Sequence, residues 1–248
     1  MPFRDYFSAQ AKEYALHRPV YPQKMFDYLA SLAPSKELAW DCGTGNGQAA
    51  LALAENFQHV IATDASAAQI ESAFPHEKIE YRVEPSENTT IASNSIDLIT
   101  VGTAVHWFDF EAFYQEVRRV SKQNGILAVW TYHFPVIEPE IDHWLEHFYW
   151  DTLSGFWPER IHYLEERYKT LPFPFEEIKP PEFEMQAIWE LDNMAGFLAS
   201  WSAVRNLVEA QGESAFDKPI KELERIWKKG TRKRKFRWPL HFRIGRVK

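Results

Sequence analysis

Residues 38–47 of this chain are Leu38-Ala39-Trp40-Asp41-Cys42-Gly43-Thr44-Gly45-Asn46-Gly47. This order is that of a buried strand, an acid and a glycine-rich turn, and residues 48–56 are predicted to form the helix that follows. A second apolar strand then ends in Asp64, 17 residues beyond Gly47. Glycines allow a turn to approach a ligand closely, and the helix directs its first N–H groups to the same place. The segment therefore predicts a nucleotide-type site, with Asp64 where a ribose-binding carboxylate is expected.

The spacing of the glycines distinguishes between possible cofactors. The dinucleotide fingerprint needs a third small residue three positions after its second glycine, and here that position holds Gln48. The third glycine comes earlier, at Gly47, so the pattern is acid-x-Gly-x-Gly-x-Gly. The residues alone indicate an adenosine-containing ligand and disfavour a nicotinamide-dependent dehydrogenase. The pattern also resembles motif I of the class I S-adenosylmethionine-dependent methyltransferases.

Composition limits the classes of protein that fit. The net charge of −7 disfavours a general nucleic-acid binder. Cys42 is the single cysteine, so no disulfide can form within the chain and a reducing compartment is expected. Residues 1–6 lack the apolar run of a signal peptide, and no segment has the roughly 18 apolar residues of a membrane span. We therefore expect a cytoplasmic protein, and the 18 Phe, 10 Tyr and 10 Trp suit a core and a pocket that excludes water.

Strand-like and helix-like segments alternate through the first half of the chain. A helix is expected over residues 110–121, where Phe113, Val117 and Val120 recur at helical spacing. Such alternation predicts a parallel sheet with helices on both faces and a ligand at the carboxyl ends of the strands. The five expected strands are 38–41, 60–64, 79–83, 95–101 and 125–130.

The character of the chain changes after about Pro135, where aromatic residues and prolines become frequent. Asp192 is expected to be the N-cap of one of the helices in this half. Helices are expected over 141–153, 192–208 and 218–229, a sixth strand over 183–191, and a final alternating strand over 236–246. We predict a single domain spanning 1–248. It would comprise a cofactor-binding core (1–135), a mostly helical lid (136–235) and a last strand (236–248).

Several further segments resemble the trans-aconitate methyltransferase-like, small-molecule group within the class I methyltransferases. They occur in order over nearly the whole chain, which makes the combination more specific than any single motif. They are residues 14–22 (YALHRPVYP), 104–109 (AVHWFD), 200–204 (SWSAV) and 238–240 (WPL). The resemblance implies a doubly wound, mostly parallel, seven-stranded α/β sheet with an antiparallel last strand and a helical lid. It also implies S-adenosylmethionine as cofactor and S-adenosylhomocysteine as product.

The resemblance also implies which residues hold the cofactor. Asp64 would accept hydrogen bonds from the ribose hydroxyls, although a turn-forming acid is the plainer alternative. Asp41 would hold the amine or fix the turn, and Arg18 would pair with the methionyl carboxylate. The expected cofactor-binding residues are Tyr14, Arg18, Asp41, Gly43, Thr44, Gly45, Asp64, Ala65, Ser86, Glu87, Ala104 and His106.

His106 is the candidate catalytic residue, because it follows the fourth strand, where the methyl group should emerge. Histidine can remove a proton from a hydroxyl near neutral pH. Alternatively, His106 packs beneath Trp107 as a wall that does not titrate. A carboxylate acceptor needs no base, since it is already an anion at pH 7. Carboxylate O-methylation is the first expectation, from the resemblance alone, and Tyr132, His133, Trp144, Trp150 and Trp201 are candidate pocket walls.

Other functions remain open at this level. A basic run over 228–237 is compatible with an RNA substrate, although a solvated turn explains it more simply. A protein methyltransferase and a non-catalytic S-adenosylmethionine-binding protein are further alternatives. His143 and His147 are four residues apart but no third ligand follows, so no metal site is expected. We expect a small-molecule substrate, no membrane partner, and a monomer or homodimer.

Overall fold

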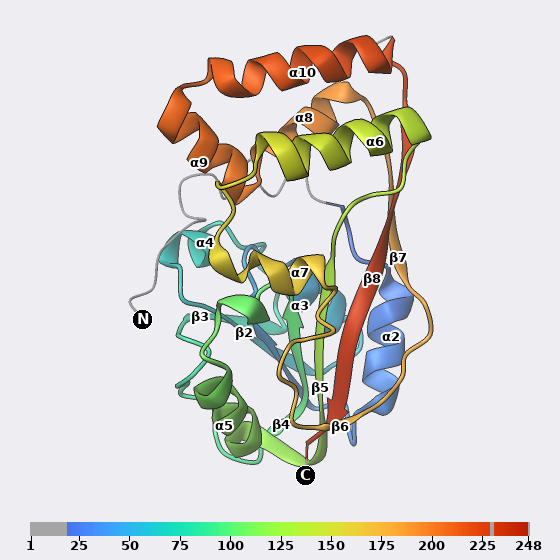
Figure 1. Ribbon diagram of the computed structural model, residues 1–248. Coiled ribbons are helices and arrows are strands. Elements are labelled where there is room, and N and C mark those ends of the chain that lie inside the picture. The colour runs from blue at the N-terminus through green and yellow to red at the C-terminus, as the bar shows by residue number, and fades with distance from the viewer. Residues whose placement is uncertain (1–18, 229–230, 248) are drawn as a thin grey trace.

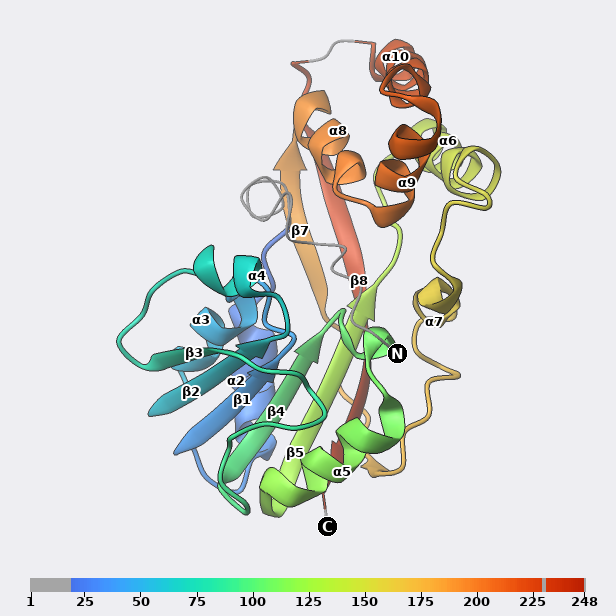
Figure 2. The ribbon, with the colours of Figure 1, turned by 90° about the vertical axis from the view of Figure 1, so that its left-hand side faces the viewer.

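The computed structural model describes residues 19–228 and 231–247, which form a twisted sheet beneath a helical cap (Figures 1 and 2). Five parallel strands follow the order β3-β2-β1-β4-β5. Their bounds are β1 Leu38–Cys42, β2 His59–Asp64, β3 Ile79–Val83, β4 Ile96–Gly102 and β5 Ser121–Tyr132. The order reverses between β1 and β4, and a ligand crevice forms at such a switch point. The five strands expected from the sequence are confirmed, within a few residues at their ends.

The antiparallel last strand is confirmed as β8 (Arg234–Arg246), which is 13 residues long. Its second half pairs with β5, and its first half pairs with β7 (Glu184–Trp189) above the sheet. The strand expected over 183–191 therefore exists but lies beside the cap. The edge position beside the second half of β8 is taken by the two-residue β6 (Glu176–Glu177), which gives an eight-stranded sheet. Prolines 172, 174, 180 and 181 flank β6 and cannot donate to a ladder, which keeps this strand short.

Helices cover both faces of the sheet, so its strands alternate between two apolar clusters. Helices α2 (Gln23–Leu32) and α3 (Gln48–Ala54) pack on one face, together with Trp130. Helix α5 (Phe110–Val120) packs on the other face, together with Trp40. Asp109 caps α5 by accepting a hydrogen bond from the backbone of Ala112 at 3.2 Å. The short helix α4 (Ala67–Glu71) follows β2.

The cap is built from the second half of the chain and lies over the carboxyl ends of β4 and β5 (Figure 2). The helix expected over 141–153 is α6 (Pro139–His147) followed by a π-helical turn, η3 (Phe148–Thr152). The single turn η4 (Glu159–Ile161) leads into α7 (His162–Glu165). Three further helices complete the cap: α8 (Leu191–Ala199), α9 (Ser202–Gln211) and α10 (Ser214–Trp227).

Two predictions in this region are wrong. The expected helix 192–208 is divided into α8 and α9, because the backbone of Trp201 is extended (φ −74°, ψ 137°). Neither Gly nor Pro marks this break in the sequence. The indole of Trp201 packs against Phe197 at 5.6 Å between ring centroids. The N-cap is Glu190, in a reciprocal capping box with Asn193, and not Asp192.

The basic run before the last strand meets acidic partners. Arg234 is buried and pairs with Glu138. Lys228 lies 3.4 Å from Glu140, and Arg237 lies 3.8 Å from Glu184. Arg234 therefore joins β8 to the start of α6, Lys228 joins the end of α10 to α6, and Arg237 joins β8 to β7. In the part of the chain that the structure describes, no helix combines the length and apolar character needed to cross a membrane.

Candidate functional site

The glycine-rich turn after β1 depends on a left-handed backbone. Gly43, Gly45 and Gly47 have φ angles of 68°, 56° and 89°, a region that costs other residues about 1–2 kcal/mol. A Cβ on Gly43 would lie 2.7 Å from the Cβ of Ala104. The turn is closed by the amide of Gly47, which donates to the carbonyl of Thr44 at 3.0 Å. The loop after β4 thus packs directly on the turn, and only glycine at position 43 permits this.

Asp64 joins the glycine turn to the loop after β2. Its Oδ2 accepts a hydrogen bond from the amide of Gly45 and its Oδ1 accepts one from the amide of Ser66, both at 2.9 Å. Its side chain is partly exposed, and Ala65 beside it is exposed. Asp64 therefore holds the glycine turn against the loop after β2, as a turn-forming acid would, and its role as a ribose ligand stays a prediction.

Asp41 lies buried beneath the same turn. Its Oδ2 accepts from the hydroxyl of Thr44 at 2.6 Å, and its Oδ1 accepts from the hydroxyl of Thr100 at 2.7 Å. Burial raises the pKa of this carboxyl to about 6. Asp41 therefore ties the turn to β4.

The loop after β3 reaches toward the start of α5. Ser86 is buried, and Oε1 of Glu87 accepts from the amide of Asp109 at 3.0 Å. The charge of Glu87 contributes to raising the pKa of the Cys42 thiol, after burial itself, so this loop lies near the end of β1. Two other predicted cofactor ligands, Tyr14 and Arg18, lie outside the described residues.

His106 lies in a 3₁₀ turn, η2 (Val105–Trp107), after β4 and is only 2% exposed. Its Nδ1 lies 2.9 Å from the hydroxyl of Tyr168. Arg160 donates to the carbonyls of His106 and Phe108, at 3.2 and 2.7 Å. Burial lowers the pKa of His106 to about 3, and the charges of Arg160 and His162 act in the same direction. The imidazole is therefore neutral at pH 7 and a weak base.

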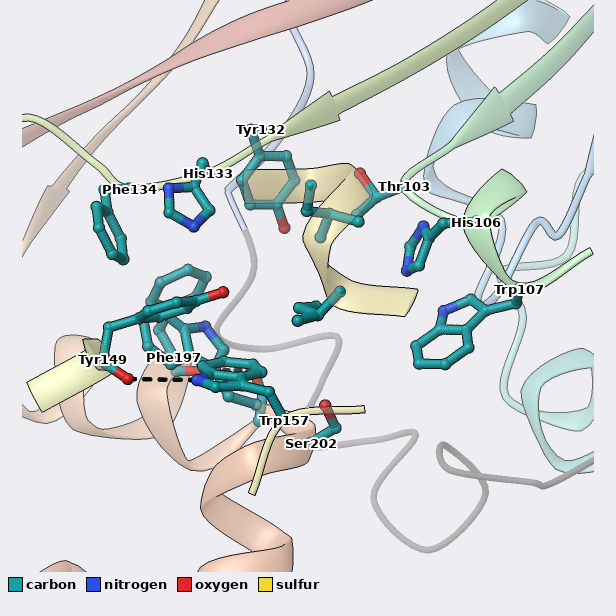
Figure 3. A pocket seen from close by; sticks show the side chains of 14 residues that line it. Thr103, His106, Trp107, Tyr132, His133, Phe134, Tyr149, Trp157, Phe197 and Ser202 are labelled. Carbon is teal, nitrogen blue, oxygen red and sulfur yellow. Dashed lines mark hydrogen bonds between the residues drawn. The ribbon is translucent and has the colours of Figure 1, made fainter. Parts of the chain in front are cut away.

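A pocket opens between His106 and the cap (Figure 3). It encloses about 720 Å³ of empty space, part of it open to solvent. None of its fourteen described lining residues is Lys, Arg, Asp or Glu. They are Thr103, His106, Trp107, Tyr132, His133, Phe134, Tyr149, Trp157, Ile161, Leu164, Phe197, Ser200, Trp201 and Ser202.

The structure separates the candidate pocket walls into two groups. Tyr132, His133 and Trp201 line the pocket. Trp144 instead stacks on Phe148 at 5.1 Å between α6 and η3, and Trp150 is 50% exposed. Tyr149, Trp157 and Phe134 were not expected. The first two come from the loops and turns of the cap. Phe134 could have been predicted, because it comes just after β5, where residues at the carboxyl end of a strand are expected to face a ligand.

A second histidine in the pocket is also uncharged. Burial lowers the pKa of His133 to about 4. Its Nε2 is buried without a hydrogen-bond partner among the described residues, and its ring packs on Phe134 and Tyr149. The pocket thus presents neutral polar atoms on an aromatic surface. In the described ranges, no group of three or more His, Cys, Asp or Glu side chains could hold a metal ion.

The edge of the sheet fits an adenosine-containing cofactor with a methionine-like arm. A Cβ on Gly45 would meet only Oε1 of Gln69, at 3.7 Å, so the outer side of the turn has room for a ligand. The Nδ2 of Asn46 is buried and makes no hydrogen bond with a described residue, so it can donate to an acceptor atom of a ligand. Asp64 adds a partly exposed carboxylate at the end of β2. This sheet order, turn and acid define the class I S-adenosylmethionine-dependent methyltransferase architecture.

Comparison with known proteins agrees with this class. Residues 40–129 match the family model described as a methyltransferase domain. A protein of Dictyostelium discoideum named as a methyltransferase is 32% identical over 84% of this chain and 81% of its own length. A protein described as a type II methyltransferase from Anaeromyxobacter dehalogenans superposes with a TM-score of 0.85 at 37% identity, over 93% of this chain and 98% of that chain. The chain belongs to the S-adenosylmethionine-dependent methyltransferase family.

A more distant relative carries the cofactor in its name. CRG1 of Saccharomyces cerevisiae, named as an S-adenosylmethionine-dependent methyltransferase, is 26% identical over 56% of this chain and 50% of its own length. None of these three names gives a methyl acceptor, so the trans-aconitate methyltransferase-like subgroup stays a prediction.

Proposed function

We propose that this protein transfers a methyl group to a carboxylate oxygen of a small organic acid with an apolar, ring-bearing body. When bound, S-adenosylmethionine supplies a methyl group made electrophilic by its sulfonium charge, and S-adenosylhomocysteine is the product. The observation that carries the proposal is the pocket beside His106, aromatic on most sides and without a charged side chain among its described lining residues. Aromatic walls of this kind suit an apolar, planar body and exclude water from the reacting atoms.

We assign the cofactor to the residues at the switch point. Asp64 would accept from the ribose hydroxyls, with Ala65 against the sugar. Gly43, Thr44 and Gly45 would border the methionyl arm, above Asp41. Ser86 and Glu87 would contact the adenine, and Ala104 and His106 would border the reacting centre. Tyr14 and Arg18 are kept as proposed ligands from the sequence resemblance.

The choice of a carboxylate follows from the absence of a suitable base among the described pocket residues. A general base works best when its pKa lies near the operating pH, but burial lowers the pKa of His106 to about 3 and that of His133 to about 4. An alcohol would need such a base, whereas a carboxylate is already nucleophilic at pH 7. Positioning of the carboxylate against the methyl group then provides the rate. This assignment also agrees with the resemblance to the trans-aconitate methyltransferase-like group, in which we place the chain.

Cofactor binding is tested by calorimetric titration with S-adenosylhomocysteine and, separately, NADH. We expect only S-adenosylhomocysteine to bind, and Asp64→Ala to weaken it about 10- to 100-fold, the cost of losing hydrogen bonds to a charged group. Asp217→Ala, an exposed acid in the first turn of α10, is the matched control and should bind like the wild type. Binding of NADH, or equal binding by Asp64→Ala and the wild type, would contradict the cofactor assignment.

The acceptor is tested with methyl-labelled S-adenosylmethionine and pairs of arylalkyl carboxylic acids and the matching alcohols. Alkali releases labelled methanol from a methyl ester but not from a methyl ether, so the product identifies the oxygen. We expect base-labile label from acids alone. Label in ethers would show that the acceptor is a hydroxyl group and not a carboxylate. Label found only in added RNA or protein would favour a macromolecular substrate, and binding without any transfer would favour the non-catalytic alternative.

A further inference from the structure

Tyr168 is held beneath His106 by an unusual stretch of backbone. Arg167 and Tyr168 have φ angles of 57° and 58°, and a left-handed backbone at residues other than glycine costs about 1–2 kcal/mol each. Arg243 of β8 holds the segment by donating to the carbonyls of Tyr168 and Leu171, at 3.1 and 2.9 Å. The side chain of Tyr168 is completely buried. A strained segment that directs one side chain to a site is a reason to look for a role of that side chain.

The hydroxyl of Tyr168 contacts the imidazole of His106, and Tyr168 itself is not among the residues that line the acceptor pocket. The oxygen lies 2.9 Å from Nδ1. The hydroxyl of Thr131 and the backbone of His106 also interact with it, and the phenols of Tyr21 and Tyr114 lie close enough to act on it. Burial raises the pKa of the phenol far above its usual value, so it keeps its proton. A phenol is a stronger acid than a neutral imidazole N–H. In this pair the phenol is therefore the better donor and Nδ1 the better acceptor.

The other nitrogen of the ring is available to a ligand. His106 lines the acceptor pocket between Thr103 and Trp107 (Figure 3). Its Nε2 makes no hydrogen bond with a described residue and is not among the fully buried unpartnered atoms, so it is open to the pocket. The partner of one ring nitrogen decides which nitrogen carries the proton of a neutral histidine.

We propose that Tyr168 is a positioning residue that donates to Nδ1 of His106 and so holds the imidazole as the neutral Nε2–H tautomer, with this N–H directed into the acceptor pocket. His106 then acts as a hydrogen-bond donor to the acceptor and not as a base, because a base would need the lone pair on Nε2. Within the function proposed above, on which this part rests, the N–H binds the carboxylate oxygen that is not methylated. The oxygen that attacks is left free to face the methyl group.

The tautomer is tested by NMR on the full chain labelled with ¹⁵N-histidine, without any ligand. Two-bond proton–nitrogen correlations distinguish the two neutral tautomers and the cation, and His106→Gln identifies the signals of His106. In the wild type we expect the Nε2–H pattern, and we expect it to stay unchanged between pH 6 and pH 8 although Arg160 and His162 lie close to the ring. An Nδ1–H pattern or a doubly protonated ring at pH 7 would overturn the proposal.

Tyr168→Phe tests the role of the hydroxyl itself, because it keeps the ring and its packing. We expect the His106 signals to shift toward a mixture of tautomers. Tyr163→Phe is the control, since Tyr163 belongs to the same segment but packs on Phe110; it should leave these signals unchanged. Unchanged His106 signals in Tyr168→Phe would show that the phenol does not set the tautomer.

Kinetics separate this role from a structural one. With an accepted acid, Tyr168→Phe should lower kcat/KM about tenfold, while the Kd for S-adenosylhomocysteine stays within about twofold. His106→Gln, whose amide reaches the position of Nε2, should keep more activity than His106→Asn, whose amide replaces Nδ1. Equal activity of the two variants would contradict a donor at Nε2. If no acid is methylated at all, the proposed function fails, whereas the NMR result still decides the tautomer.

Discussion

Gly43→Ala is the substitution that tests most directly how the glycine turn is built. The new Cβ would lie 2.7 Å from the Cβ of Ala104 and 3.2 Å from Cζ of Phe108, at a φ of 68°. The left-handed backbone costs about 1–2 kcal/mol, and forcing an extra carbon into a packed contact adds about 1–3 kcal/mol. We therefore expect Gly43→Ala to lower the free energy of unfolding by about 2–5 kcal/mol.

Gly45→Ala provides the matched comparison within the same turn. Its φ of 56° is similar, but the new Cβ would meet only Oε1 of Gln69, at 3.7 Å. Only the backbone cost of about 1–2 kcal/mol should remain. The difference between the two variants thus isolates the contact between the turn and the loop after β4.

Urea unfolding followed by circular dichroism gives these free energies, and a third variant completes the test. Ala104→Gly removes the carbon that the new Cβ meets, so the double variant Gly43→Ala/Ala104→Gly should be more stable than the sum of the two single changes predicts. The reasoning is refuted if Gly43→Ala costs no more than Gly45→Ala, or if the two changes at positions 43 and 104 are simply additive.

Three further outcomes follow from the site. Because burial lowers the pKa of His106 to about 3, the unfolded chain binds a proton below about pH 6.5 that the folded protein excludes. The free energy of unfolding therefore decreases as the pH falls. Between pH 7 and pH 5, this decrease should be about 2 kcal/mol smaller for His106→Gln than for the wild type in urea unfolding. Equal decreases would contradict the burial argument. Arg160→Met should lower the free energy of unfolding by about 1–3 kcal/mol, because it removes a charged donor to the carbonyls of His106 and Phe108; an unchanged urea midpoint would count against it. Trp201→Ala should raise the KM for the acceptor at least about tenfold without changing the affinity for S-adenosylhomocysteine. Trp150 is half exposed and outside the pocket, so Trp150→Ala should change neither quantity. A similar KM in both variants would place the acceptor elsewhere.

The sheet was predictable because its signal is local. Buried parallel strands are mostly apolar, as in Ile96–Gly102, and the ends of such strands also carry the residues of the glycine turn and Asp64. The strand nearest the cap was harder to place. Phe183–Leu191 has the composition of a strand, but nothing in it tells which half of β8 it pairs with.

The rest of the site depends on contacts between distant segments. Tyr168 meets His106 across 62 positions of the sequence, and its left-handed backbone has no glycine to announce it. Trp157 reaches the pocket wall from a loop without periodicity, where aromatic content alone does not distinguish core from site. The break at Trp201 between α8 and α9 follows from ring packing and not from local helix propensity. Such features become visible only when the cap is folded over the sheet.

Because β8 is long enough to pair with both β7 and β5, a shift in its register would affect the cap and the parallel sheet together. One strand pairs with β7 through Arg234–Pro239 and with β5 through Leu240–Arg246, so both pairings share a single register. A slip of one residue against β7 would turn Trp238 and Phe236 out of the cap and, in the same movement, turn Ile244 out of the sheet. An insertion or deletion within β8 cannot be absorbed on one side alone. A register error on either side of β8 would therefore disturb the cap and the sheet together.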